Sequence, residues 1–468
     1  MLFNSFEFLL FFPLVCIIYF ALGKNKYRNP FLLIASYYFY MNWKPIYALL
    51  ILTSTVLTYG CGLLVEKYQG KQGKRKLFLT VSLVLNFGIL FVFKYYNFIN
   101  ESVFSLMEMM HLRWTVPNLD ILLPVGISFY TFQAVGYSVD VYRGTLKAER
   151  NFFTYALFVS FFPQLVAGPI ERAKNLLPQF HEEHRLDYNN VCEGFKQMVW
   201  GFFMKLCVAD VLSQYVDAVY NNVANHNGTS MILATIFFTF QIYCDFGGYS
   251  NIAIGASKIM GYHLMENFHR PYLSLSMKEF WKRWHISLSS WFMDYVYIPL
   301  GGNRCKYSRH LLNLLITFLV SGIWHGANWT FVIWGAYHGV LICLNNIKTK
   351  LLGKPNRKLT LLRVPLCFLL AAFGWIFFRA NNVADAFTII GKIFADWGPL
   401  FSDKDVFLTG FLSIAILICK DIKDEASIRL NFMHSKHIVV RYASVAMIIT
   451  YIMLFGALSG GQFIYFQF

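Results

Sequence analysis

Charged side chains are scarce in this sequence of 468 residues, because Asp, Glu, Lys and Arg together make up 14% of it, against about 25% in a soluble domain. This scarcity excludes a disordered chain and a coiled coil, and it is not the composition of an ordinary cytosolic enzyme. The apolar fraction is 57%, and the mean hydropathy is +0.46. A chain this apolar needs lipid as well as a core, so the composition predicts an integral membrane protein.

The sequence also lacks a pattern of paired cysteines. The nine cysteines are scattered, mostly in apolar runs, and none form a C-x-x-C pair, which argues against both a disulfide framework and a zinc site.

Acidic residues are fewer than basic ones. There are 25 Asp and Glu against 41 Lys and Arg, which gives a net charge of +16. In a membrane protein this excess is typical of basic cytoplasmic loops, so we expect no nucleic-acid partner. The first apolar run, from Leu2, lacks a basic leader and a cleavage site, and we expect it to be retained.

Twelve apolar runs reach, or come near, the length of a membrane span, which is about 20 residues. The run at 31–42 is short and doubtful as a complete span. The runs lie at 3–22, 31–42, 45–65, 77–98, 121–141, 195–220, 231–257, 310–326, 329–346, 361–378, 406–419 and 440–457. They predict an all-α polytopic membrane protein of about 11–12 transmembrane helices, with re-entrant and interfacial helices, around a central funnel. We find no internal repeat, and we predict one domain over 1–468 with its catalytic core at about 121–346.

The loops between these runs differ in charge. The segments 66–76 and 347–358 each hold five basic residues, with one acid and none respectively. The segment 100–120 leans acidic, and 221–230 has no Lys, Arg, Asp or Glu. Because basic loops stay in the cytoplasm, this pattern predicts that the two basic segments are cytoplasmic and that both termini lie outside.

This orientation of the loops and termini requires the segment 152–169 to enter and leave the membrane on the same side. Its sequence, FFTYALFVSFFPQLVAGP, contains Pro163, Gly168 and Pro169, which are unfavourable inside a helix. Such backbone is tolerated at membrane depth only where protein or a water-filled cavity surrounds it. We therefore predict a broken or re-entrant segment.

The stretch 258–310 is too polar to span a membrane and too apolar for a solvated loop. From Ser276 to Tyr295 it has the periodicity of an amphipathic helix. The apolar positions are Phe280, Trp284, Leu288 and Trp291, and the basic ones between them are Lys278, Lys282 and Arg283. One interpretation is an interfacial helix lying on lipid headgroups. The other is a funnel wall in which Lys282 and Arg283 bind a phosphate-bearing acyl donor.

A histidine stands in the apolar stretch 319–340. An ionisable side chain at membrane depth is costly and is by default a functional candidate, so His325 is the strongest candidate in the chain. The alternative is a neutral imidazole that only bonds neighbouring helices. We expect Gly322 and Gly326 to leave room for a substrate, unless they simply let helices approach.

Three other polar residues are weaker candidates. His338 is interpreted as a structural partner; together with His285 and His325 it has no spacing typical of a metal site, so we expect no metal. Ser321 lies one turn before His325, but we interpret it as a packing residue because no orienting group is apparent. Asp245 either orients a histidine or closes a turn.

Four segments carry a family resemblance. They are FFPQLVAGPIER (161–172), QIYCDFGGYSNIAIGASKIMG (241–261), NFHRPYLSLSMKEFWKRWHISLSSWFMDYVYIPLGGNR (267–304) and SGIWHGANWTFVIWGAYHG (321–339). The chain resembles the membrane-bound O-acyltransferase superfamily over nearly its whole length, with 379–468 the least diagnostic part. It is most similar to the bacterial branch containing the membrane subunit of alginate O-acetylation and the D-alanyl transfer protein of teichoic acids.

The resemblance implies two catalytic positions, a histidine in the apolar span and a polar residue upstream, which fall on His325 and His285. Acyl transfer to a hydroxyl requires removal of the hydroxyl proton, and an imidazole suits that role. We expect His325 to be the general base. We expect His285, or a donor beside it, to orient the acyl group or to stabilise the oxyanion.

The implied activity is transfer of an acyl group, most of all acetyl, from a cytoplasmic thioester to a hydroxyl of an exported or cell-envelope polysaccharide. The donor is acetyl-CoA or another acyl thioester, with no bound cofactor, and an extracytoplasmic acyltransferase partner completes the transfer unless it is direct. The implied location is a bacterial inner membrane. Three alternatives remain open: D-alanyl transfer to teichoic acid, a transporter or flippase without chemistry, and a scaffold for a polysaccharide-exporting complex.

Overall fold

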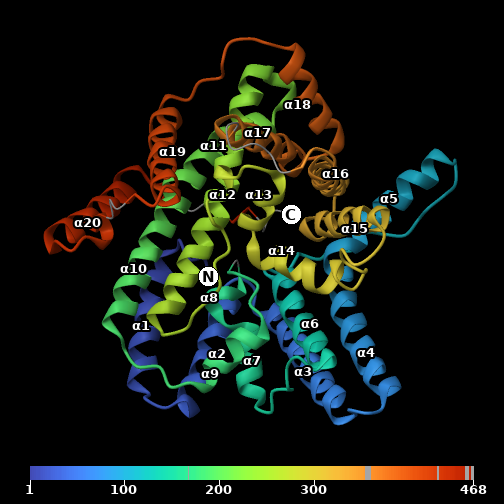
Figure 1. Cartoon of the computed structure of the whole chain (residues 1–468), viewed down its shortest axis with the longest axis vertical. Coiled ribbons are helices and arrows are strands. Elements are labelled where there is room, and N and C mark those ends of the chain that lie inside the picture. The colour runs from blue at the N-terminus through green and yellow to red at the C-terminus, as the bar shows by residue number, and fades with distance from the viewer. Residues whose placement is uncertain (167, 354–359, 429–431, 459–462, 465–468) are drawn as a thin grey trace. The chain divides into compact units, whose positions relative to one another are not determined.

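The computed structural model describes residues 1–166, 168–353, 360–428, 432–458 and 463–464 (Figure 1). Within these ranges the regular secondary structure is helical and there is no β-strand, which confirms the predicted all-α class. The chain divides into two compact units. Unit 1 consists of Met1–Gly194 and Ala256–Met265, and unit 2 of Phe195–Gly255 and Glu266–Phe468.

Unit 1 is built on a packed group of three helices, α3, α4 and α6, each of which contacts the other two. Its helices are α1 (Phe6–Ala21), α2 (Asn25–Met41), α3 (Ala48–Lys67), α4 (Gln72–Leu90), α5 (Tyr96–Met109), α6 (Ile127–Arg143), α7 (Phe152–Ser160), α8 (Phe162–Leu165) and α9 (Ala173–His181). The predicted break in 152–169 is confirmed, because the helix stops at Phe161, whose ψ is 111°. Pro163 falls in the first turn of α8, where its missing N–H leaves no bond unmade.

Unit 2 holds the remaining helices, and α10 (Tyr188–Phe202) and α12 (Gly228–Ile259) contribute residues to both units. The others are the π-helical turn η3 (Phe203–Ala209), α11 (Asp210–Tyr220), α13 (Met277–Arg283), α14 (Ile286–Phe292), α15 (Tyr307–His325), α16 (Trp329–Leu352), α17 (Thr360–Arg379), α18 (Val383–Ala395), α19 (Lys404–Glu425) and α20 (Ile438–Phe455). Helices α15 and α16 pack along each other, and α13 contacts α14, α16 and α17. One face of the short helix α13 is thus packed against other helices of unit 2.

Seven helices among the described residues are long and apolar enough to cross a membrane, so the chain is a polytopic membrane protein. The sequence suggested eleven or twelve, and the difference has two causes. Helices α1, α2 and α6 have only 16, 17 and 17 residues, and α15 and α19 carry polar or charged residues near their ends.

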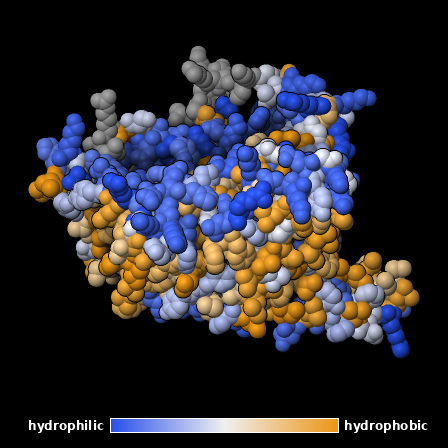
Figure 2. Space-filling model, turned by 90° about the horizontal axis from the view of Figure 1, so that it is seen from below, coloured by the Kyte–Doolittle hydropathy of each residue, from blue (hydrophilic) through white to orange (hydrophobic). Residues whose placement is uncertain are grey.

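The surface has the apolar character that a lipid-facing protein needs. Leu10 and Ile17 on α1, and Met447 and Leu454 on α20, expose most of their side chains. Figure 2 shows one face on which hydrophobic side chains cover a broad area beside a layer of hydrophilic ones. Residues 354–359 of the predicted cytoplasmic segment 347–358 lie outside the described residues.

Candidate active site

The segment predicted as one amphipathic helix forms two short helices with a break between them. Helix α13 begins after Ser276, whose hydroxyl accepts a hydrogen bond from Glu279 N at 3.2 Å. At the break, His285 has φ 43° and ψ 56°, the left-handed region that costs a residue with a Cβ. The apolar positions Trp284 and Leu288 are buried in unit 2. The interfacial-helix interpretation is therefore wrong, because these side chains lie in a protein core.

The side chain of His285 is fully buried beside Asn267. Its Nδ1 lies 3.1 Å from Asn267 Oδ1, which also accepts hydrogen bonds from Ser287 N at 3.2 Å and Ser287 Oγ at 2.8 Å. Phe246 packs on the imidazole edge, with ring centroids 4.5 Å apart. Burial lowers the pKa of His285 to about 3, since a charged imidazole would lose its hydration there. His285 is thus a neutral imidazole at physiological pH.

The second predicted residue, His325, is the last residue of α15 and is 2% exposed. Its ring centroid lies 6.5 Å from that of His285, 4.9 Å from that of Trp334 and 5.4 Å from that of Phe378. The structure thus brings together two histidines that are 40 positions apart in the chain. Both are packed among aromatic rings in the core of unit 2.

The glycines next to His325 do not leave room for a substrate. A Cβ added to Gly322 would collide with the Phe331 carbonyl oxygen, and one added to Gly326 would collide with the Phe331 ring. The expectation of substrate space is therefore wrong. These glycines allow the start of α16 to pack tightly against the end of α15, and so they fix the backbone that carries His325.

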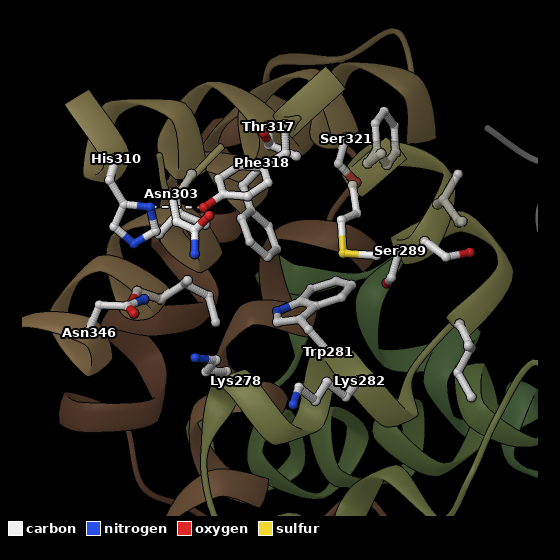
Figure 3. Close-up of a pocket in the computed structure, with 18 residues that line it drawn as sticks. Lys278, Trp281, Lys282, Ser289, Asn303, His310, Thr317, Phe318, Ser321 and Asn346 are labelled. Atoms are coloured by element: carbon white, nitrogen blue, oxygen red, sulfur yellow. Dashed lines mark hydrogen bonds between the residues drawn. The ribbon is translucent and has the colours of Figure 1, made fainter. Parts of the chain in front are cut away.

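A cavity of about 610 Å³ lies within unit 2, lined in part by residues next to His285 in the chain (Figure 3). Its lining comprises Lys278, Trp281, Lys282, Ile286, Leu288, Ser289, Ser290, Phe292, Met293, Tyr297, Asn303, His310, Leu314, Thr317, Phe318, Ser321, Ile342 and Asn346. Figure 3 shows Lys278 and Lys282 together at one side of the cavity and Ser321 at another. Ser321 is one helical turn before His325, and Ile286 directly follows His285, but neither histidine is among the lining residues.

The two predicted donor-binding residues lie in different surroundings. Lys282 is exposed and lines the cavity, whereas Arg283 is not among the lining residues. The Arg283 guanidinium bonds Glu279 at 2.6 Å and Glu425 at 2.8 and 3.0 Å. These hydrogen bonds, with Glu425 first, raise the pKa of Arg283 and lower that of Glu425. Lys278 was not among the predicted residues, although it lies one turn before Lys282 on the same face of α13.

The remaining weaker candidates and one missed residue also have defined places. His338 is fully buried among Trp281 and Trp334, with ring centroids 5.1 and 4.9 Å away. Asp245 does not contact a histidine in any described interaction; its Oδ1 lies 2.6 Å from Lys205 Nζ. Lys205 was not predicted as a site residue, although an ionisable side chain within the apolar run 195–220 is itself a signal.

Comparison with known proteins gives this geometry its context. The profile of the MBOAT, membrane-bound O-acyltransferase family, matches residues 35–384. The probable alginate O-acetylase AlgI of Azotobacter vinelandii is 39% identical over 89% of this chain and 83% of its own length. The peptidoglycan O-acetyltransferase of Helicobacter pylori is 33% identical over 83% of this chain and 79% of its own. The teichoic acid D-alanyltransferase of Streptococcus thermophilus is 31% identical over 58% of this chain and 69% of its own.

The family profile covers both histidines and the cavity, and three quarters of the sequence lies inside the match. The all-helical fold and the membrane-spanning helices agree with it. The resemblance in the four sequence segments is confirmed. The chain belongs to the membrane-bound O-acyltransferase family.

Proposed function

We propose that this protein moves an acetyl group from a cytoplasmic acyl thioester to a hydroxyl of an exported or cell-envelope polysaccharide. The transfer is direct or is completed by an acyltransferase partner outside the membrane, and the protein resides in a bacterial inner membrane. The observation that carries the proposal is the buried pair of His285 and His325, 6.5 Å apart, beside a cavity with two lysines. A polysaccharide acceptor is supported by relatives whose names specify alginate and peptidoglycan.

In the proposed reaction the acceptor hydroxyl attacks the thioester carbonyl carbon. A C–O bond forms, the C–S bond breaks, and the thiolate leaves. His325 takes the hydroxyl proton as general base, and the leaving thiolate is finally protonated. His285 is the second member of the pair and orients the reacting groups. Burial away from bulk water strengthens such interactions and also protects the thioester from hydrolysis.

The cavity suits the non-reacting part of the donor. Acyl thioesters of the coenzyme type carry phosphate groups, and the ammonium groups of Lys278 and Lys282 lie together on one side of the cavity (Figure 3). The apolar part of the lining accommodates the rest of the donor molecule. The ion pairs of Arg283 with Glu279 and Glu425 support a different task, which is to attach the end of α13 to α19.

Acetyl is favoured over D-alanyl transfer by the extent of the similarity. The O-acetylating relatives match 83–89% of this chain at 33–39% identity. The D-alanyltransferase of S. thermophilus matches 58% of it at 31% identity. A donor of the D-alanyl type remains the alternative that an assay must include.

The decisive experiment supplies purified protein in lipid nanodiscs with a thioester of radiolabelled acetate and, separately, of radiolabelled D-alanine. The proposal predicts release of free thiol with transfer of the acetyl label to polysaccharide, to partner protein or, without an acceptor, slowly to water. Transfer of the D-alanine label without transfer of the acetate label would show that the acyl group is D-alanyl. Label that crosses proteoliposomes with its thioester intact would indicate a transporter, and neither transfer nor transport would indicate a scaffold.

A further inference from the structure

Asn267 holds the residue that the proposed chemistry depends on. It lies 18 positions before His285 and is 1% exposed. Its backbone carbonyl accepts a hydrogen bond from Ile286 N at 2.9 Å, directly after the left-handed His285. Its side-chain Oδ1 contacts His285 Nδ1 at 3.1 Å, and its Nδ2 donates to Ser250 Oγ at 3.1 Å. Asn267 thus holds both the ring of His285 and the backbone of the next residue, Ile286.

The orientation of the Asn267 amide follows from its neighbours. A backbone N–H only donates, and Ser287 N lies 3.2 Å from the atom assigned as Oδ1. Exchanging Oδ1 and Nδ2 would set two donors against each other, so the oxygen must face Ser287. An amide oxygen carries no hydrogen. Ser287 Oγ also lies 3.4 Å from His285 Nδ1, but its hydroxyl donates to Asn267 Oδ1 at the shorter distance of 2.8 Å. The hydrogen of the bond between Asn267 Oδ1 and His285 Nδ1 therefore belongs to the imidazole.

We infer that Asn267 is a positioning residue of the transfer site, which holds His285 as the tautomer with its proton on Nδ1 and its lone pair on Nε2. This inference rests on the proposed function, because it concerns the work of His285 in acyl transfer. A neutral imidazole has one donor and one acceptor nitrogen, so using Nδ1 as donor leaves Nε2 as acceptor. In this form His285 supplies no N–H to an oxyanion.

The tautomer determines which kind of substrate group His285 can bind. An acceptor nitrogen binds a hydrogen-bond donor of the substrate. A sugar ring offers such a donor in the hydroxyl beside the one that is acylated, whereas a thioester carbonyl offers only lone pairs. His285 therefore orients the hydroxyl-bearing acceptor rather than the thioester, while His325 takes the proton. The oxyanion is left to other N–H groups.

Two substitutions at the same site separate positioning from packing. Asn267→Asp keeps an oxygen acceptor toward His285 and Ser287, whereas Asn267→Leu removes it at similar volume. The matched control is Asn313→Leu, because Asn313 is also fully buried in unit 2 and donates to Gly302 O at 3.1 Å, away from the histidines. The readouts are ¹⁵N spectra of histidine-labelled protein, with the His285 signals assigned by their loss in His285→Gln, and acetyl-transfer kinetics.

We expect His285 in the unchanged protein to show a protonated Nδ1 and an unprotonated Nε2. Asn267→Leu should give a mixture of tautomers and lower kcat/KM for the acceptor by on the order of 10²-fold, while Asn267→Asp and Asn313→Leu retain more activity. A protonated Nε2 in the unchanged protein, or an unaltered tautomer in Asn267→Leu, would overturn the inference. If Asn267→Leu does not fold, the spectrum of the unchanged protein still decides. A chain with the expected tautomer and no acyl transfer would refute the proposed function and leave the positioning role intact.

Discussion

Unit 2 buries two polar clusters of opposite kinds. The histidine centre, which consists of His285, His325 and Asn267, contains the neutral imidazole of His285 and is lined by aromatic rings. The ion cluster consists of Lys205, Asp210 and Asp245. Lys205 Nζ lies 2.8 Å from Asp210 Oδ1 and 2.6 Å from Asp245 Oδ1, and all three residues are at least 95% buried.

The difference shows what each cluster is suited to do. A buried charge is tolerated only if it is paired, and each pair then resists rearrangement because separating it is costly. The ion cluster also anchors distant chain, since Asp245 Oδ2 accepts a hydrogen bond from Ile464 N at 2.7 Å. A neutral imidazole keeps a proton-accepting nitrogen without that cost. We therefore expect the histidine centre to control activity and the ion cluster to control stability.

The largest effect should come from His325→Gln, which keeps hydrogen-bonding capacity and removes basicity. Loss of a general base lowers turnover by typically 10²–10⁴-fold, so we expect acetyl transfer near background with an unchanged unfolding temperature in detergent. The measurement is transfer of labelled acetate together with a thermal unfolding curve.

His338→Gln is the matched control for that substitution. His338 is as buried as His325 and packs on the same Trp334, but it lies outside the histidine centre. We expect this variant to retain most of its activity. An active His325→Gln protein would remove the base from the proposed mechanism, and equal losses in both variants would show that any polar change near Trp334 is disruptive.

The opposite pattern is expected for Lys205→Met in the ion cluster. The substitution leaves two buried carboxyl groups without their cation, and breaking a buried pair in this way typically costs about 3–5 kcal/mol. We expect a marked fall in unfolding temperature and in yield, with acetyl transfer per folded molecule largely retained. Lys174→Met, at an exposed lysine of α9, should be nearly neutral. A stable but inactive Lys205→Met protein would contradict the division between the two clusters.

Much of the fold was predictable because it follows from local pattern. Long apolar runs predict membrane helices, and the prolines and glycine in 152–169 predict a break, which the structure has at Phe161. The helix across 276–295 was predicted as continuous because Phe280, Trp284 and Leu288 recur with helical spacing. That spacing does not reveal a left-handed residue, which His285 adopts because Asn267 and the surrounding core hold it there.

The candidate site was predictable only in part. An imidazole in an apolar run is conspicuous, so His325 could be found from the sequence, and the family resemblance added His285. Asn267 carries no such signal, since its contact with His285 exists only in the folded chain. Arg283 and Lys278 show the same limit. The ion pair of Arg283 with Glu425 depends on the position of α19, and the place of Lys278 in the cavity depends on the position of α15.

The cavity extends the comparison to substrate binding. Replacing Lys278 and Lys282 by Gln should raise KM for acetyl-CoA by about tenfold per lysine, because a charge-assisted bond to phosphate contributes about 1.5–3 kcal/mol. The matched control is Lys306→Gln, at an exposed lysine that does not line the cavity. A short acetyl thioester without phosphates should react equally with all of these proteins.

The comparison of acetyl-CoA with the short acetyl thioester also tests the role of Arg283. If Arg283→Gln lowers the unfolding temperature and leaves KM unchanged, its ion pairs with Glu279 and Glu425 are its role. A selective rise in KM for the phosphate-bearing donor would instead restore Arg283 to the donor site. An unchanged KM in the double lysine variant would mean that the cavity does not hold the donor phosphates.

The smallest effect is expected within the ion cluster itself, where two carboxyl groups face one lysine. Among the described residues, Asp210 Oδ2 has no hydrogen-bond partner, while both oxygens of Asp245 are used. Asp210→Asn removes surplus negative charge and keeps one oxygen for Lys205, so we expect a change in unfolding free energy within about 1 kcal/mol. Asp245→Asn loses a charged acceptor that serves two donors, and should cost about 1–3 kcal/mol. Thermal unfolding curves should show a lower unfolding temperature for Asp245→Asn than for Asp210→Asn. The reverse order would mean that Asp210 is the essential counter-ion and that Ile464 is not held through Asp245.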